Sequence, residues 1–120
     1  MLNILIIEAN QKLKKPYQYL SPAYQTVRLS TIEKAGAIFL NFKPELIFLS
    51  CSFSPQQIIT FLDCVANECR PHLIPIIFVI DLNHPLNFIP GTHWGQQTAV
   101  FSEFTSKHEF YTTLDRLLNY

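Results

Sequence analysis

Three near-continuous runs of apolar residues constrain the fold of this chain more than any other feature of its sequence. They cover residues 2–7, 46–49 and 73–80. A strand with one solvated face alternates apolar and polar residues, whereas an unbroken apolar run is typical of a central parallel strand that is covered on both faces. We therefore expect a parallel β-sheet with helices packed against both of its faces.

Helical patterns separate these runs, and three of them begin with the same start signal. The signal is a Ser followed three positions later by Glu or Gln, the capping box of a helix N-terminus. The pairs are Ser30 with Glu33, Ser54 with Gln57, and Ser106 with Glu109. Each pair follows a candidate strand, at residues 26–29, 46–50 and 98–101. Strand and helix in repeated alternation predict an α/β sheet with right-handed crossovers.

Two connections in this pattern are abnormal. The segment between residues 8 and 26 is interrupted by Pro16 and Pro22, so the first helix should be short or begin at Pro16. The segment between residues 80 and 98 contains two prolines and two glycines, a composition that resists a regular helix. We therefore predict a loop or a single helical turn in place of a fourth helix.

The size and charge of the chain narrow its class. At 120 residues it fits one domain, residues 1–120, which would bury roughly two-thirds of the surface of its unfolded form. Nine basic and nine acidic residues cancel, so no overall field favours nucleic acid. The one local basic cluster, at Lys12, Lys14 and Lys15, is interpreted as an ordinary solvated face. We predict no nucleic-acid partner.

The sequence also bears on membrane and compartment. No apolar run approaches the roughly 20 residues that a membrane helix needs, so no membrane association is expected. The chain begins Met1-Leu2-Asn3 without a basic leader, which is not the layout of a secretory signal. Three cysteines without Cys-x-x-Cys spacing argue against a disulfide framework or a zinc site. These features together predict a cytoplasmic protein.

Residues 44–50, Pro-Glu-Leu-Ile-Phe-Leu-Ser, carry the most specific family resemblance. They look like the Pro-Asp-Leu-apolar-apolar-apolar-Asp strand of the receiver domain of two-component response regulators, and residues 2–8 look like the family's first strand. The resemblance covers the whole chain. It implies a flavodoxin-like, five-stranded parallel sheet of strand order 2-1-3-4-5, here with a shortened first helix and an irregular or missing fourth helix.

The family's chemistry is missing at the corresponding positions. Receivers hold Mg²⁺ with an acidic pair after the first strand and with the Asp that accepts the phosphoryl group, because a hard divalent ion prefers carboxylate oxygens. Here Glu8 and Ala9 occupy the pair, and Ser50 occupies the acceptor position. The hydroxyl residue of the fourth strand falls near Ile80, and the Lys of the fifth strand falls on Glu103. The resemblance therefore implies a degenerate phosphorylation site, a pseudo-receiver that is not an enzyme and uses no cofactor.

The same sheet edge also carries residues that could serve other chemistry. Glu8, Asp81 and Glu103 could hold a metal weakly, although three separate solvated or capping carboxylates are the simpler interpretation, because no spacing motif joins them. The run from Ser50 through Cys51, with His84 opposite, could serve a small enzyme or a ligand or redox sensor, but no glycine flanks it to form a nucleophile elbow. Cys51 is interpreted as a buried, inert thiol. The enzyme or sensor stays as the alternative function.

The remaining signal is an aromatic surface. Residues 81–97 are irregular and apolar-rich, and they should lie beside the fifth strand and the last helix, the partner and dimer face of receivers. The predicted protein-binding residues are Phe88, Trp94, Phe101, Phe104 and Tyr111. Aromatic residues concentrate energy at interfaces, although these aromatics could instead simply cover the sheet. We expect a protein partner in a signalling pathway, or a homodimer through this face.

Overall fold

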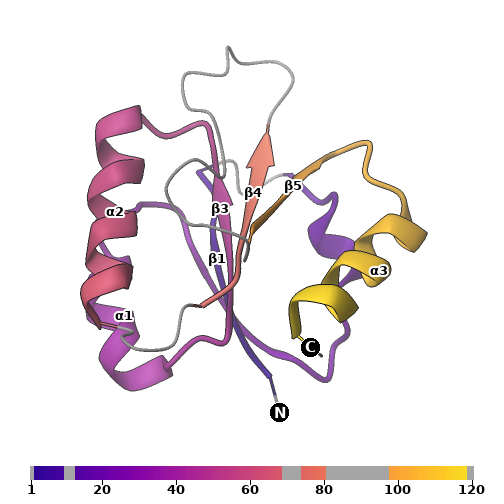
Figure 1. The fold of residues 1–120 in the computed structure, drawn as a ribbon, viewed down its shortest axis with the longest axis horizontal. Coiled ribbons are helices and arrows are strands. Elements are labelled where there is room, and N and C mark those ends of the chain that lie inside the picture. The colour runs from indigo at the N-terminus through magenta and orange to yellow at the C-terminus, as the bar shows by residue number, and fades with distance from the viewer. Residues whose placement is uncertain (1, 10–12, 69–73, 81–97, 119–120) are drawn as a thin grey trace.

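The computed structural model describes residues 2–9, 13–68, 74–80 and 98–118 (Figure 1). In these segments five parallel strands form one sheet in the order β2-β1-β3-β4-β5. The strands are β1 (Asn3–Ile7), β2 (Gln25–Leu29), β3 (Leu46–Ser50), β4 (Ile76–Ile80) and β5 (Thr98–Ser102). The helices are η1 (Tyr17–Tyr19, a 3-10 turn), α1 (Ala35–Phe42), α2 (Pro55–Glu68) and α3 (Lys107–Leu118). The predicted flavodoxin-like fold class and its strand order are confirmed.

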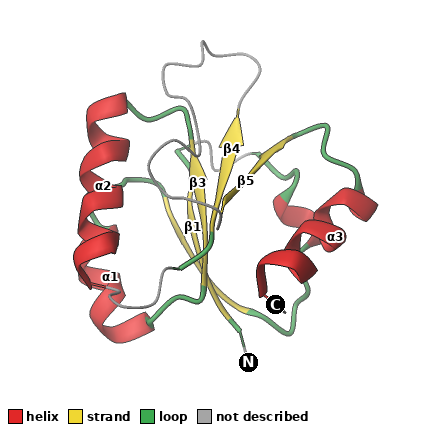
Figure 2. Ribbon diagram, viewed as in Figure 1, coloured by secondary structure: helices red, strands yellow, loops and turns green. Residues whose placement is uncertain are grey.

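The three central strands are buried almost throughout, which explains their unbroken apolar sequences. Every residue of β3 is buried, as are four of the five residues in each of β1 and β4. Helices cover both faces of the sheet: α1 and α2 lie on one side, and α3 lies on the other (Figure 2). No solvated face remains on which polar residues could alternate.

The two faces have different cores. Against α1 and α2 the core is mainly aliphatic, with Ile58 and Val65 of α2 fully buried on Leu49 and other strand residues. Against α3 the core is aromatic: the ring of Phe110 stacks on Phe48 at a centroid distance of 6.1 Å and an interplanar angle of 9°. The odd and even positions of each central strand therefore enter separate clusters, as the two-residue period of a strand requires.

The helix start signals hold in two of three cases. The backbone N–H of Gln57 donates to Ser54 Oγ, and the Gln57 side chain accepts from the Ser54 N–H, so the capping box of α2 is complete. The backbone N–H of Glu109 likewise donates to Ser106 Oγ at the start of α3. The prediction for Ser30 is wrong, because α1 begins only at Ala35.

A tertiary contact accounts for the failure at Ser30. The carboxylate of Glu33, the expected capping partner of Ser30, accepts a 2.8 Å hydrogen bond from Nε2 of Gln57 on the neighbouring helix α2. Residues 31–34 form a turn instead, in which the N–H of Ala35 donates to the carbonyl of Ile32. A contact between this turn and α2 has therefore replaced a local one.

The structure describes most of the first abnormal connection and none of the second. Between β1 and β2, residues 13–24 contain only the 3-10 turn η1, in agreement with the predicted shortening of the first helix. The predicted irregular or missing fourth helix, at residues 81–97, lies outside the described residues. None of the helices in the described segments is long and apolar enough to span a membrane.

Candidate functional site

The strand register aligns the predicted site residues along the C-terminal edge of the sheet. Ile7 pairs with Leu49, which places Glu8 and Ser50 directly after that pair on neighbouring strands. Ser50 pairs in turn with Val79, one residue before Ile80. Parallel strands all end at one edge, and ligands of open α/β sheets bind there. The predicted positions are thus gathered at the edge expected for a binding site.

Ser50 is buried and already engaged in a hydrogen bond. Its side chain is 1% exposed, and its Oγ lies 2.7 Å from Ser52 Oγ. The backbone N–H of Ser52 also donates to Ser50 Oγ over 3.2 Å. The hydroxyl therefore closes a local turn after β3. A phosphoryl donor would have to displace Ser52 before it could reach this oxygen.

Glu8 is also buried, at 2% exposure, and its carboxylate is held by a tyrosine from η1. The Tyr17 hydroxyl donates to Glu8 Oε2 over 2.9 Å. Burial raises the pKa of Tyr17 well above its ordinary value, and the Glu8 carboxylate raises it further. Tyr17 thus stays protonated and remains a donor at any physiological pH. The carboxylate that could have served a cation is committed to an internal contact.

Arg28 of β2 extends this cluster. Its guanidinium carbon lies 4.8 Å from the centroid of the Tyr17 ring, and its NH2 group donates to the carbonyl of Leu13 over 2.9 Å. A cation over an aromatic face is attracted by the ring quadrupole. Arg28 therefore ties both the ring and the backbone of residues 13–17 to the edge strand. The shortened first connection is held in place by these polar contacts as well as by packing.

Tyr17 and Arg28 were missed by sequence analysis. Tyr17 is nine residues from Glu8, with no motif spacing, and Arg28 lies within a candidate strand to which no function was assigned. The one available signal was Pro16, which placed the start of a helical turn directly before Tyr17. That signal located the turn but not the direction of the tyrosine side chain.

The remaining degenerate positions carry no described hydrogen bond to this cluster. Ala9 is exposed just after Glu8, Ile80 ends β4, and Glu103 is half-buried in the turn after β5. That turn is closed by Ser102 and Thr105: the N–H of Ser102 donates to Thr105 Oγ1 over 2.9 Å. The sheet edge near β5 therefore carries the Glu103 carboxylate beside the hydroxyls of Ser102 and Thr105, which both accept hydrogen bonds from backbone N–H groups.

Cys51 fits the prediction of a buried thiol. It is 5% exposed, and burial, reinforced by the Glu8 carboxylate, raises its pKa to about 12. Thiolate is the nucleophilic and oxidisable form, so a thiol with a raised pKa is poorly reactive at neutral pH. Cys51 therefore offers no support for the redox or nucleophilic alternative.

Only part of the possible weak metal site lies within the residues that the structure describes. Asp81, like His84, lies outside the described residues. Within the described segments, no group of three or more His, Cys, Asp or Glu is arranged to hold a metal ion. The Glu8 carboxylate already accepts the Tyr17 hydroxyl hydrogen bond.

The predicted protein-binding residues divide into three groups. Phe104 is 74% exposed and Tyr111 is 43% exposed, as expected of surface residues. Phe101 is 1% exposed and packs on Phe110 at 5.3 Å between centroids, so its assignment to the surface patch is corrected: it alternates inward along β5. Val100, its neighbour, is 45% exposed in its place. Phe88 and Trp94 lie outside the described residues.

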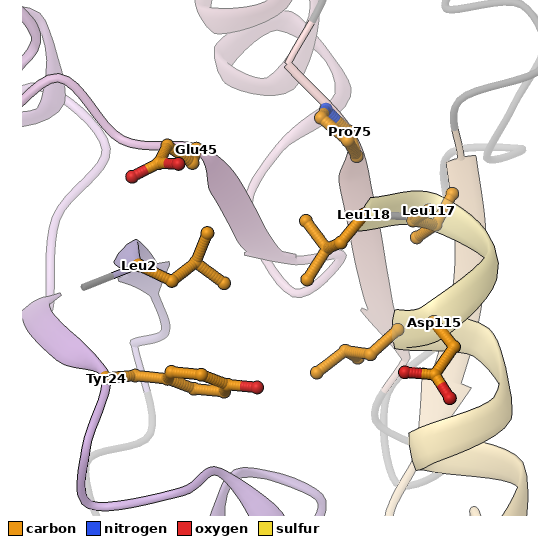
Figure 3. A pocket seen from close by; sticks show the side chains of 8 residues that line it. Leu2, Tyr24, Glu45, Pro75, Asp115, Leu117 and Leu118 are labelled. Atoms are coloured by element: carbon orange, nitrogen blue, oxygen red, sulfur yellow. The ribbon is translucent and has the colours of Figure 1, made fainter. Parts of the chain in front are cut away.

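A separate cavity of about 470 Å³ opens at the opposite, N-terminal edge of the sheet (Figure 3). Leu2 and Tyr24 point across it toward Leu118 of α3, with Glu45 and Asp115 also in its lining. This cavity lies where the first connection enters β2, far along the strands from Ser50. It shares no lining residue with the candidate site.

Comparison with known proteins supports the fold and nothing finer. No protein-family model matches the sequence, and a search of curated proteins finds no match. The described fold is that of a flavodoxin-like receiver domain. A similar solved structure is the signal receiver domain of a putative Luxo repressor protein from Vibrio parahaemolyticus, with a TM-score of 0.73, 18% identity, and coverage of 98% of this chain and 89% of that one.

Proposed function

We propose that the chain is a pseudo-receiver, a single domain over residues 1–120 that works in signal transduction by binding another protein and does not depend on phosphorylation. We further propose that it acts in the cytoplasm, without nucleic acid, membrane or cofactor. The fold supports the general class, because it is shared with a signal receiver domain. The state of the site supports independence from phosphorylation.

The observation that carries this proposal is the environment of Ser50. The residue ends the strand at which receivers carry their acceptor Asp, and its hydroxyl is 1% exposed and paired with Ser52. A serine hydroxyl is a far weaker nucleophile than a carboxylate at neutral pH and needs an adjacent base. The nearest carboxylate in the register, that of Glu8, already accepts from Tyr17.

Charge around the site argues in the same direction. Glu103 stands where the resemblance implies a lysine that pairs with the phosphoryl oxygens. A carboxylate there repels the anion that a lysine would attract. The side chain of Ile80, at the end of β4, has no group that could donate a hydrogen bond to a phosphoryl oxygen.

The proposed partner surface is defined by Val100, Phe104 and Tyr111, which we call the β5–α3 patch. All three side chains are large, apolar or aromatic, and exposed. The Tyr111 hydroxyl donates to the carbonyl of Tyr19 over 2.9 Å, which fixes the ring on the surface before a partner arrives. Preorganised aromatic groups lose little entropy on binding. A second copy of the chain is the other occupant proposed for this patch.

The phosphorylation part is tested by incubating the protein with acetyl phosphate and Mg²⁺ and measuring intact mass. We expect no added phosphoryl group, and Mg²⁺ should leave the melting temperature unchanged. A stable phosphorylated species on Ser50 would refute the proposal. An authentic receiver treated in parallel shows that the reagent is active.

The binding part is tested by sedimentation and affinity capture with matched variants. Phe104→Ala removes the most exposed aromatic group of the β5–α3 patch, whereas Ile59→Ala removes an exposed apolar group (38%) from α2 on the other face. We expect a stoichiometric partner, or a dimer, to be lost in Phe104→Ala and kept in Ile59→Ala. Equal behaviour of the two variants would place the interface elsewhere.

A further inference from the structure

A second, smaller cavity lies between α1 and α2, on the face of the sheet opposite α3. Its volume is about 270 Å³, and we call it the α1–α2 groove. Its apolar lining includes Ile32 and Phe61, which are 6% and 5% exposed and belong to the aliphatic core. The groove therefore opens directly onto the packed interior and has a preformed floor.

Gly36 on α1 keeps this groove open. It lines the cavity, and a Cβ built on its backbone would meet no atom within 4 Å. Gly costs roughly 1 kcal/mol relative to Ala inside a helix, and here no close packing requires it. Its effect at this position is to leave space that any larger side chain would occupy.

Polar groups on α2, and Glu33 just before α1, also line the groove and are joined by hydrogen bonds. Nε2 of Gln57 donates to Oε1 of Glu33 over 2.8 Å, and Nε2 of Gln56 donates to Oγ1 of Thr60 over 3.3 Å. Glu33 is the one charged residue in the lining of this groove, which consists entirely of described residues. An apolar floor with a few oriented polar groups is the usual composition of a small-molecule site.

We propose that the α1–α2 groove binds a small apolar molecule of about ten non-hydrogen atoms that carries one ammonium or N–H donor. A cavity of about 150 Å³ with an apolar lining accommodates benzene, so this groove has room for one ring with a short chain. The carboxylate of Glu33 selects the donor group by charge. This ligand site shares no residue with the β5–α3 patch.

The first experiment titrates the ¹⁵N-labelled protein with 2-phenylethylamine, the probe cation, and follows amide shifts by NMR. The comparison probes are ethylbenzene, which has the ring without the charge, and 3-phenylpropionate, which has the opposite charge. We expect saturable shifts at Ile32, Gly36 and Phe61, with the cation binding more tightly than either other probe. Absence of saturable shifts, or equal affinity for the anion, would overturn the proposal.

Three variants locate the site. Gly36→Leu fills the groove, whereas Gly36→Ala adds only a methyl group, and both replace Gly with a better helix former, so both are expected to fold. The amine should lose at least about tenfold in affinity in Gly36→Leu and far less in Gly36→Ala. Glu33→Gln should weaken the amine by up to about fivefold and leave ethylbenzene unchanged. Undiminished binding to Gly36→Leu would overturn the assignment.

A third measurement needs no variant, because Cys64 lines the groove with a half-buried free thiol. The rate at which iodoacetamide labels Cys64 can be read by peptide mapping. At ten times its Kd, 2-phenylethylamine should slow this labelling about tenfold, whereas the same concentration of 3-phenylpropionate should not. Labelling of Cys64 at an unchanged rate in the presence of saturating amine would contradict the site.

Discussion

The hydroxyl of Tyr17 donates a 2.9 Å hydrogen bond to Oε2 of Glu8, and both side chains are buried. Tyr17→Phe removes the donor and leaves a buried carboxylate oxygen with one hydrogen bond fewer. Because hydrogen bonds to charged groups are among the strong ones, the free energy of unfolding should fall by about 1–3 kcal/mol. Urea denaturation followed by circular dichroism measures this change.

Tyr19→Phe is the matched control for that substitution. Tyr19 also packs its ring on the aromatic core, 5.5 Å from the Phe110 centroid, and the hydrogen bond it receives from Tyr111 ends on its backbone carbonyl, which the substitution keeps. We expect a change within about 0.5 kcal/mol. Equal losses in the two variants would show that the Glu8 contact contributes nothing specific.

Alkaline pH should destabilise the protein in part through Cys51. Burial first, and the Glu8 carboxylate second, raise the pKa of this thiol from 9.0 to about 12. The native state therefore holds its proton over a range in which the unfolded state has lost it. Its contribution to the free energy of unfolding is complete below pH 9 and is lost as the pH rises toward about 12.

The measurement is the pH slope of the unfolding free energy in the wild type and in Cys51→Ala. Between about pH 9 and about pH 11 the wild type should lose up to about 1.4 kcal/mol per pH unit more than the variant. Tyr17, whose pKa is raised in the same direction mainly by burial and the Glu8 carboxylate, is present in both proteins, so most of its contribution cancels in the difference. Parallel slopes would mean that Cys51 is not protected in the native state.

Restoring the acceptor alone should not restore phosphotransfer. In Ser50→Asp the positions of Ala9, Ile80 and Glu103 still lack the acidic partner, the hydroxyl and the lysine of receivers. A carboxylate at a 1% exposed position beside Glu8 should also lower the free energy of unfolding by at least about 2 kcal/mol.

The assay is mass spectrometry after treatment with acetyl phosphate and Mg²⁺. The comparison protein carries Ala9→Asp, Ser50→Asp, Ile80→Thr and Glu103→Lys together, which reinstates each missing group. We expect labelling only in that combined variant. Stable labelling of the single Ser50→Asp variant would contradict the reasoning about the edge.

Alanine substitutions at Phe101 and Phe104 should differ in their effect on stability, because one ring belongs to the core and the other to the proposed partner surface. Phe101→Ala removes a fully buried ring and should cost about 3–5 kcal/mol in unfolding free energy. Phe104→Ala, at 74% exposure, should change stability by less than about 0.5 kcal/mol. Thermal unfolding measures both. A large stability loss in Phe104→Ala would remove it from the β5–α3 patch and assign it to packing.

Lys43 offers a stabilising substitution. It follows α1 directly with φ of 51°, a left-handed conformation that disfavours residues with a Cβ. Lys43→Gly should raise the free energy of unfolding by about 0.5–1 kcal/mol. Lys43→Ala keeps the Cβ and serves as the control, with little change expected. A gain in the alanine variant equal to that in the glycine variant would exclude backbone strain as the cause.

The strands and their order could be predicted because burial on both faces leaves a direct mark on the sequence. Leu46 and the residues after it are apolar at every position, since each meets either α1 and α2 or α3. Once the strands are parallel, the position of Ser50 and Glu8 at one edge follows from topology alone. Local start signals were equally informative for α2, where Ser54 and Gln57 complete their own contact.

The sequence does not show which distant partner a side chain will contact. Glu33 could cap its own helix or reach Gln57 on the next one, and only the packing of α1 on α2 decides between them. The direction of Tyr17 toward Glu8 has the same character. Phe101 has the same character, because Ala99, Val100 and Phe101 are all apolar and only the packing on α3 shows that Phe101 is buried while Val100 is exposed.

The closed turn at Ser50 has a consequence for timing. A receiver that carries a phosphoryl group is reset when that group is hydrolysed, so its output lasts as long as one chemical bond. Under the proposed function, Ser50, which is paired to Ser52, forms no such bond. Under the proposed function its output would follow the number of molecules present, so synthesis and degradation would set how fast the signal rises and decays.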